Sequence, residues 1–290
     1  MSSADPSSGK GHRDENFPVA SRLIKPRHRA PILAFYRFAR AADDVADHAG
    51  ASAEVKLRLL DEMERTLLGE LDSAPEAHAL RLVLERHSLS AQHALLLLEA
   101  FRRDATKRRY ADWDELMDYC RYSAMPVGRF VLDVHGEARA TWPASDALCA
   151  ALQVINHLQD CAKDYRDLDR VYLPHDLMAE RGARAEMLGA AKAPAPLRAV
   201  IAALAGRTTD LLAQSRGFAA GIADRRLALE VSLIQTLAED LNRGLLTRDP
   251  LSQRVHHRGF ELVPLAVAAL ARFLGRRHLQ TSSIQPAAET

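Results

Sequence analysis

The sequence lacks the cysteine pattern and the charge imbalance that mark several classes of protein. Its three cysteines, Cys120, Cys149 and Cys161, are odd in number and have no metal-ligand spacing, which argues against a disulfide framework and fits a reducing cytoplasm. The 39 basic and 38 acidic residues almost balance, so the overall charge gives no reason to expect nucleic acid as a partner. Recognition of an anion must therefore be local.

Long apolar runs are also absent. The most apolar late segment, residues 262–274, is too short to cross a membrane, and the polar N-terminal residues contain no signal-peptide core. We therefore expect a soluble, cytoplasmic protein, and a peripheral contact with the inner membrane stays open. A glycine fingerprint for dinucleotides is missing as well, so a built-in NADPH step is unsupported.

What the sequence does contain is apolar residues at helical spacing along most of its length. With 290 residues, 48% of them hydrophobic, the chain is long enough to bury a large core, and no boundary divides residues 15–279. We expect an all-α protein with one helical domain around a central cavity, and mobile tails at residues 1–14 and 280–290. The predicted helices cover residues 30–47, 55–71, 78–86, 90–106, 113–134, 145–166, 197–220, 225–246 and 259–274.

The first candidate site is the sequence DDVAD at the end of an apolar helix. At about 100° of turn per residue, Asp43 and Asp47 share one helix face, and Asp44 lies at its edge. Tyr36 and Arg40 fall on the same side, and the Arg40 guanidinium offers paired donors to a diphosphate. Alone, the motif fits a solvated acidic helix end equally well. The apolar residues before it and the absence of mixed Lys and Glu favour an inward face.

A second polar stripe follows offsets of three and four residues. Gln153, Asn156, Asp160 and Asp164 fall within roughly 80° of arc on a helix whose other faces are apolar. A buried hydrogen-bond network is the alternative. Because clustered carboxylates repel one another, we expect a cation to pair them, and oxygen ligands suit Mg²⁺. The expected ligands, direct or through water, are Asp43, Asp44, Asp47, Asn156, Asp160 and Asp164.

Three basic residues follow the second stripe. Lys163, Arg166 and Arg170 are candidates to cover phosphate, although a solvated basic edge explains each one singly almost as well. His157 points off the stripe, so we interpret it as a packing or supporting residue.

A third segment, residues 119–136, contains a proline and a glycine inside an apolar helical pattern. Pro126 removes a helical hydrogen bond, and Gly128 allows another backbone or a ligand to come close. Tyr119 and Tyr122 are candidates to present hydroxyls to a cavity. An ordinary kinked core helix is the alternative.

With these three segments in hand, the chain resembles the squalene/phytoene synthase family over about residues 16–274. The family's second motif, QxxNxxxDxxxD, is matched in full from Gln153 to Asp164, and its trailing YLP occurs at Tyr172. The family's YCxxxAxxVG helix is matched from Tyr119 to Gly128. The resemblance implies a class I isoprenoid synthase fold, in which Mg²⁺ assists the departure of a diphosphate group.

Two departures indicate which reaction to expect. Family members that condense two prenyl diphosphates usually carry an Arg where this chain has Gln159, and a basic segment where it has RDENF at residues 13–17. A site with fewer basic residues suits a substrate that carries one diphosphate group rather than two. The chain is most similar to the hydroxysqualene synthase branch of bacterial hopanoid pathways. This implies presqualene diphosphate as substrate and hydroxysqualene as product, with presqualene diphosphate synthase and hydroxysqualene oxidoreductase as pathway neighbours.

The implied chemistry also requires an apolar cavity that shelters a carbocation, and one residue that positions the attacking water. Tyr119 is our candidate for that role. A synthase that condenses two prenyl diphosphates to squalene, dehydrosqualene or phytoene is the alternative reaction, and a non-catalytic helical assembly protein of the same fold is the alternative class. The expected lining of the cavity is Phe35, Phe38, Val127, Phe130 and Val131.

Overall fold

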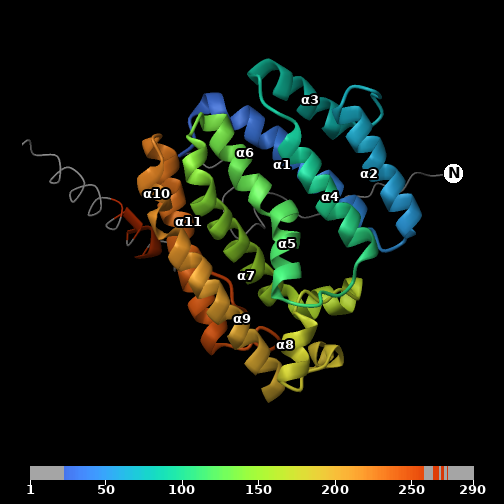
Figure 1. Cartoon of the computed structure of the whole chain (residues 1–290), viewed down its shortest axis with the longest axis vertical. Coiled ribbons are helices and arrows are strands. Elements are labelled where there is room, and N and C mark those ends of the chain that lie inside the picture. Colours follow the sequence, from blue (N-terminus) through green and yellow to red (C-terminus); the bar gives the residue numbers. More distant parts are fainter. Residues whose placement is uncertain (1–22, 258–263, 268, 271–272, 274–290) are drawn as a thin grey trace, which may run out of the picture.

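Helices form nearly all the regular structure of the part of the chain that is described, residues 23–257, 264–267, 269–270 and 273 of a computed structural model (Figure 1). Within these residues there is no strand, only an isolated bridge between Arg109 and Val171. The all-α prediction is therefore confirmed. The expected tails and the segment at residues 13–17 lie outside the described residues.

The observed helices overlap with most of those predicted. The short helix α8 was not predicted, α1 begins at Pro26 rather than at residue 30, and the predicted helix at 197–220 is divided at Ser215. Of the predicted helix at 259–274, residues 264–267, 269–270 and 273 are helical and the rest lie outside the described residues. The α-helices are α1 (Pro26–Asp47), α2 (Ala53–Leu67), α3 (Pro75–His87), α4 (Gln92–Thr106), α5 (Trp113–Ser123), α6 (Met125–His135), α7 (Trp142–Leu168), α8 (His175–Glu180), α9 (Ala195–Gln214), α10 (Phe218–Gly221) and α11 (Arg225–Thr247).

The single helix predicted at residues 113–134 is two helices, because the chain breaks at Ala124. The backbone there leaves the helical region, with φ −124° and ψ −48°. Pro126 then falls in the first turn of α6, where a missing N–H leaves no helical hydrogen bond unmade. The close approach predicted at Gly128 is confirmed. A Cβ atom at this position would lie 2.4 Å from Ser145 Oγ and 2.6 Å from Cys149 Sγ of α7.

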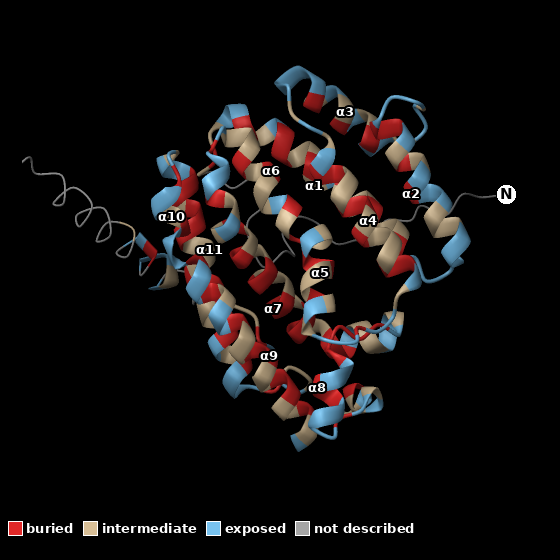
Figure 2. Ribbon diagram, in the orientation of Figure 1, coloured by how far each residue is buried: buried red, intermediate tan, exposed pale blue. Residues whose placement is uncertain are grey.

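Two clusters of buried apolar side chains form the core, and α6 lies between them. The first cluster contains residues of α1, α2, α3 and α4. The second contains residues of α5, α7, α8, α9 and α11. Phe130 of α6 stacks on Phe35 in the first cluster, with ring centroids 4.0 Å apart, whereas Leu132 belongs to the second. Figure 2 shows that the buried residues line the faces that these helices turn inward. Among the described residues, none of the helices combines the length and the apolar character of a membrane span.

The close contact between α6 and α7 gives a test of the packing. We expect Gly128→Ala to lower the free energy of unfolding by about 1–3 kcal/mol, because the new methyl group overlaps with Ser145 and Cys149. Urea denaturation measures the change. Gly206→Ala is the matched control, because a Cβ at Gly206 in α9 meets nothing within 4 Å. That variant should be neutral or more stable by about 0.5–1 kcal/mol. Equal stability of both variants would contradict the predicted overlap.

Candidate active site

The first aspartate motif occupies the last two turns of α1. Asp43 and Asp47 are one turn apart, and Arg40 lies a turn before Asp43. The Arg40 guanidinium donates from Nη1 to Asp43 Oδ2 at 2.8 Å, and its Nη2 lies 3.5 Å from Asp44 Oδ1. Tyr36 lies one turn earlier and lines an apolar cavity together with Arg40 and Asp43. The predicted face of the helix is therefore present, with a cation among its acids.

The second motif follows one side of α7. Its four residues are half-buried, whereas their neighbours Ile155 and Leu158 are fully buried, so the stripe lies at the edge of the core. The buried residue His157 contacts Gln153, the first residue of this motif. Burial lowers the pKa of His157 to about 3, so the ring is neutral and its Nε2 lies 3.1 Å from the Gln153 amide. The motif residues are Gln153, Asn156, Asp160 and Asp164.

Carboxylates from three helices approach one another at this site. Burial and the neighbouring Asp47 charge raise the pKa of Asp43 to about 7. Burial, then the Asp160 charge, with a further contribution from Asp47, raise the pKa of Asp164 to about 7. On α4, burial raises the pKa of Asp104 to about 6. Since the Asp47 charge acts on Asp104 of α4 and on Asp164 of α7, the end of α1 lies near both of these helices.

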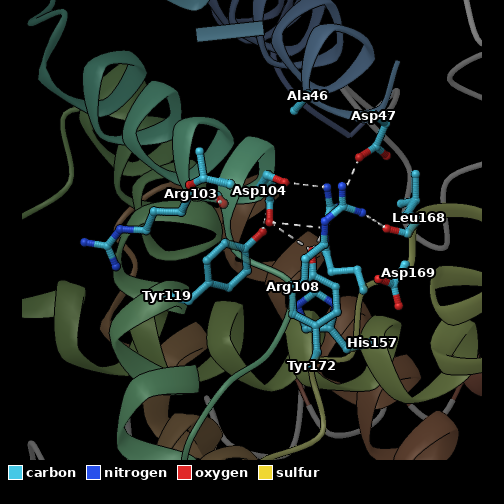
Figure 3. Close-up of polar contacts among 12 residues, drawn as sticks. Ala46, Asp47, Arg103, Asp104, Arg108, Tyr119, His157, Leu168, Asp169 and Tyr172 are labelled. Carbon is cyan, nitrogen blue, oxygen red and sulfur yellow. Dashed lines mark hydrogen bonds and ion pairs between the residues drawn. The ribbon is translucent and has the colours of Figure 1, made fainter. Parts of the chain in front are cut away.

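Arg170 joins two of these acids, Asp47 and Asp104, in a buried network. Figure 3 shows Asp47 and Asp104 together with Tyr119 and Tyr172. The Arg170 Nη1 donates to Asp47 Oδ1 at 3.1 Å, and its Nη2 donates to the Asp104 carbonyl at 2.9 Å. Two tyrosines satisfy the Asp104 carboxylate: Tyr119 donates to Oδ2 at 2.7 Å and Tyr172 to Oδ1 at 3.1 Å. Arg170 therefore ties α1 to α4 with its side chain only 6% exposed.

The end of α7 explains how Arg170 reaches this position. Asp169 adopts a left-handed conformation with φ 51°, which an aspartate tolerates better than most residues. The chain then turns back, so that the Arg170 N–H donates to the Asp164 carbonyl at 3.1 Å. Arg109 holds the turn by donating to Asp169 Oδ1 at 2.6 Å. Of the three predicted basic residues, Arg170 is buried in the site, whereas Lys163 and Arg166 are exposed on α7.

An apolar cavity of about 410 Å³ begins beside the carboxylates. It starts among Tyr36, Arg40 and Asp43 and continues between α1, α6, α7 and α11. A second hollow of about 630 Å³ lies near α8 and shares no lining residue with this cavity. The predicted lining residues found in the cavity wall are Phe35, Val127, Phe130 and Val131.

Two residues predicted at the cavity lie elsewhere. Phe38 is fully buried in the cluster of α1–α4 and is not part of the cavity wall. Tyr119 is buried in the network below the cavity wall, and its hydroxyl donates to Asp104. Burial, then the Asp104 charge, raise the pKa of Tyr119 well above its ordinary value, so the hydroxyl stays a donor to that carboxylate. This arrangement does not present the Tyr119 hydroxyl to the cavity.

The sequence analysis missed three polar residues of the site. Asp104 follows a basic stretch of α4, and no pattern in the sequence relates it to the two motifs. Ser145 and Glu230 are buried in the wall of the apolar cavity. A signal existed for Glu230, because it shares a helical face with Leu227 and Ile234, which line the cavity too.

The acids of this site fit a divalent cation by their chemistry. They are oxygen donors, and burial followed by repulsion from a neighbouring aspartate raises the pKa of Asp43 and of Asp164. Among the residues described, however, no three His, Cys, Asp or Glu side chains form a ready-made metal site. The acids of α1 and α7 would therefore have to turn toward a shared cation, with other oxygens completing its coordination.

Comparison with known proteins now gives the family. A model of the squalene/phytoene synthase family matches residues 11–261. The chain belongs to this family. It is 56% identical to the hydroxysqualene synthase of Rhodopseudomonas palustris, with 93% of this chain and 92% of that protein aligned. It is 57% identical to the hydroxysqualene synthase of Zymomonas mobilis, with 91% and 90% aligned.

Solved structures agree with the predicted fold. The squalene synthase HpnC from Alicyclobacillus acidocaldarius is 33% identical, with a TM-score of 0.69 over 78% of this chain and 86% of that one. A dehydrosqualene synthase in complex with ligand superposes with a TM-score of 0.78 over 90% and 93% at 21% identity, and so bears on the fold alone. The class I isoprenoid synthase fold is confirmed, and this type of enzyme is generally metal-dependent.

The raised pKa values predict how stability depends on pH without metal. A carboxyl whose pKa is about 7 in the folded protein and near 4 when unfolded stabilises the fold at low pH, and this contribution is lost as pH rises to about 7. With metal removed by a chelator, Asp43→Asn should therefore raise the midpoint temperature of thermal unfolding more at pH 8 than at pH 5. Because more than a third of the Asp43 side chain is exposed, we expect a gain of only about 1 kcal/mol at pH 8.

The control is Asp210→Asn, at an exposed position of α9. Thermal unfolding should show no comparable pH-dependent gain for this variant. A loss of stability in Asp43→Asn at pH 8 would mean that the carboxylate is attracted to Arg40 more than it is repelled by its acidic neighbours.

Proposed function

We propose that the protein is a hydroxysqualene synthase, which converts presqualene diphosphate and water into hydroxysqualene and diphosphate. The observation that carries the proposal is one cavity with Asp43 and Arg40 of the first motif at one end and apolar walls beyond them. Relatives named hydroxysqualene synthase, 52–57% identical over most of the chain, support this particular reaction. A presqualene diphosphate synthase would supply the substrate, and a hydroxysqualene oxidoreductase would consume the product.

The polar end would bind the diphosphate group. Mg²⁺ held by Asp43, Asp44, Asp47, Asn156, Asp160 and Asp164 would neutralise the leaving group's charge as it departs. Arg40 would donate to diphosphate oxygens from the same end, and Lys163 and Arg166 would cover them from α7. Arg170 would hold Asp47 in place, because it already donates to that carboxylate. Gln153 and Asn156 would contribute amide donors.

The apolar end would control the carbocation. The carbon–oxygen bond breaks and diphosphate leaves with the electron pair. Water then adds its oxygen to the rearranged cation and releases one proton. Walls such as Phe35 and Phe130 exclude other water while the chain rearranges. A role for Tyr119 in positioning the water stays a prediction without support from its contacts, since the hydroxyl is engaged by Asp104.

Two other functions are less well supported. Condensation of two prenyl diphosphates would need cations for a second diphosphate, and Gln159 instead donates its amide to the Val255 carbonyl. A non-catalytic assembly protein would have no need to keep five motif aspartates and a buried arginine together. Cytoplasmic location with peripheral contact to the inner membrane stays a prediction.

The reaction itself is the first test. Purified protein given presqualene diphosphate and Mg²⁺, without NADPH, should form a thirty-carbon alcohol. In water labelled with heavy oxygen, mass spectrometry should find one labelled oxygen in the alcohol, because the hydroxyl comes from solvent. Farnesyl diphosphate alone should be a poor substrate. Efficient formation of squalene or phytoene from it would favour the condensing reaction instead.

The metal ligands are the second test. Asp43→Ala or Asp160→Ala should lower turnover by at least about a hundredfold, because each removes an oxygen ligand from the cation. Circular dichroism should show unchanged helical content, since neither side chain is in the core. Asp210→Ala on α9 is the control and should retain normal turnover. Near-normal activity of both motif variants would refute the two-motif site.

A further inference from the structure

Residues 249–257, which we call the strap, follow α11 and run back to the second motif. Hydrogen bonds hold the first residues of the strap in place. Asp249 is buried, and its carboxylate accepts hydrogen bonds from the Ala193 N–H at 3.0 Å, the Leu251 N–H at 3.0 Å and the Ser252 hydroxyl at 2.7 Å. Arg198 of α9 donates to the Arg248 carbonyl at 2.6 Å, just before the strap begins. The path of the strap is therefore set by α9 and by its own turn.

The far end of the strap is tied to α7. The buried Gln159 side chain donates from Nε2 to the Val255 carbonyl, and the Val255 side chain is packed at Gly244 of α11. His257 is held from the other side, with its Nε2 3.2 Å from Asp240 Oδ2. His256 lies between these two fixed residues. The hydrogen bond from Gln159 therefore fixes the backbone directly before His256, whereas the His257 side chain contacts α11.

His256 lies beside the second aspartate motif. His256 follows Val255, whose carbonyl accepts the hydrogen bond from Gln159, the residue directly before Asp160, so the strap carries His256 to this part of α7. Burial lowers the pKa of His256, and the charge of Asp160 opposes that shift. The Nδ1 atom of His256 is buried and has no hydrogen-bond partner among the described residues. The ring is half-buried, so part of it remains accessible. A nitrogen donor is thus placed next to a proposed metal ligand, with hydrogen-bonding capacity unused.

We propose that His256 is a substrate-binding residue whose imidazole N–H donates to the diphosphate group beside Asp160, and that Gln159 is the positioning residue that sets it there through Val255. The proposal rests on the proposed function for the identity of the diphosphate compound, but it concerns binding of the diphosphate group itself. A neutral imidazole suffices, because one ring nitrogen always carries a proton. Such a donor would help to offset the many acids around the bound group.

Binding of inorganic diphosphate tests this without turnover. In calorimetric titrations with Mg²⁺ present, His256→Phe should bind diphosphate about tenfold more weakly, because one hydrogen bond to an anion is lost. His256→Asn, which keeps a donor, should lose less. The matched control is His257→Asn, whose side chain contacts Asp240 of α11 and not the motif. It should bind within twofold of the parent protein.

A double-mutant cycle tests the part played by Gln159. Gln159→Leu keeps the volume but cannot donate to Val255, so it should weaken diphosphate binding in the parent protein and have little further effect in His256→Phe. Unfolding midpoints verify that each variant is folded. If His256→Phe binds within twofold of the parent, or His257→Asn loses as much, the proposal is wrong. If the losses of diphosphate affinity caused by Gln159→Leu and His256→Phe simply add in the double variant, Gln159 does not act through His256.

The two proposals can fail separately. If the parent protein forms no hydroxysqualene but its diphosphate affinity depends on His256, the proposed function is wrong and this inference stands. If the parent protein forms hydroxysqualene and His256→Phe binds diphosphate normally, only this inference fails.

Discussion

Repulsion among partly buried carboxylates is the constraint on which the rest of the site depends. Burial, and after it the charges of neighbouring acids, raise the pKa of Asp43, Asp104 and Asp164 on α1, α4 and α7. Arg170 is the buried cation that makes this arrangement tolerable, because it touches both Asp47 and Asp104. The tyrosines around Asp104 then satisfy its remaining lone pairs. Asp43 and Asp164 keep a raised pKa despite the neighbouring cations, and this is where an added cation would bind.

The sequence predicted the helices and the two aspartate motifs because both depend on local periodicity. Spacing by three and four residues fixes which side chains share a face of α1 or α7, whatever packs against them. It could not tell a core face from a cavity wall, since both are apolar. Phe35 and Phe38 illustrate this: both are buried in the cluster of α1–α4, but only Phe35 also lines the cavity.

Other parts of the site depend on contacts between distant segments, which one sequence does not reveal. Tyr119 fitted a motif, but the structure ties its hydroxyl to Asp104, fifteen positions earlier in the chain. No pattern in the sequence marked Asp104 as a residue of the site. Similarly, Gln159 was recognised as a departure from a family pattern, but its hydrogen bond to Val255, 96 residues later, could only come from the fold. Helix α7 is buried on several faces, so consecutive residues serve different neighbours.

The division of the core into two clusters has a consequence for the order of folding during synthesis. The cluster of α1–α4 uses residues 35–98 together with Phe130, so most of it can pack once the first half of the chain has left the ribosome. The acids of α1 then already lie beside α4, before Arg170 has been made. The bond from Gln159 to the strap waits until Val255 emerges. The helices that position the first motif thus fold before Arg170, the cation that binds Asp47, is available. A nascent chain stalled between α4 and Arg170 would expose an incomplete site that contains the acids of α1 and α4 without this arginine.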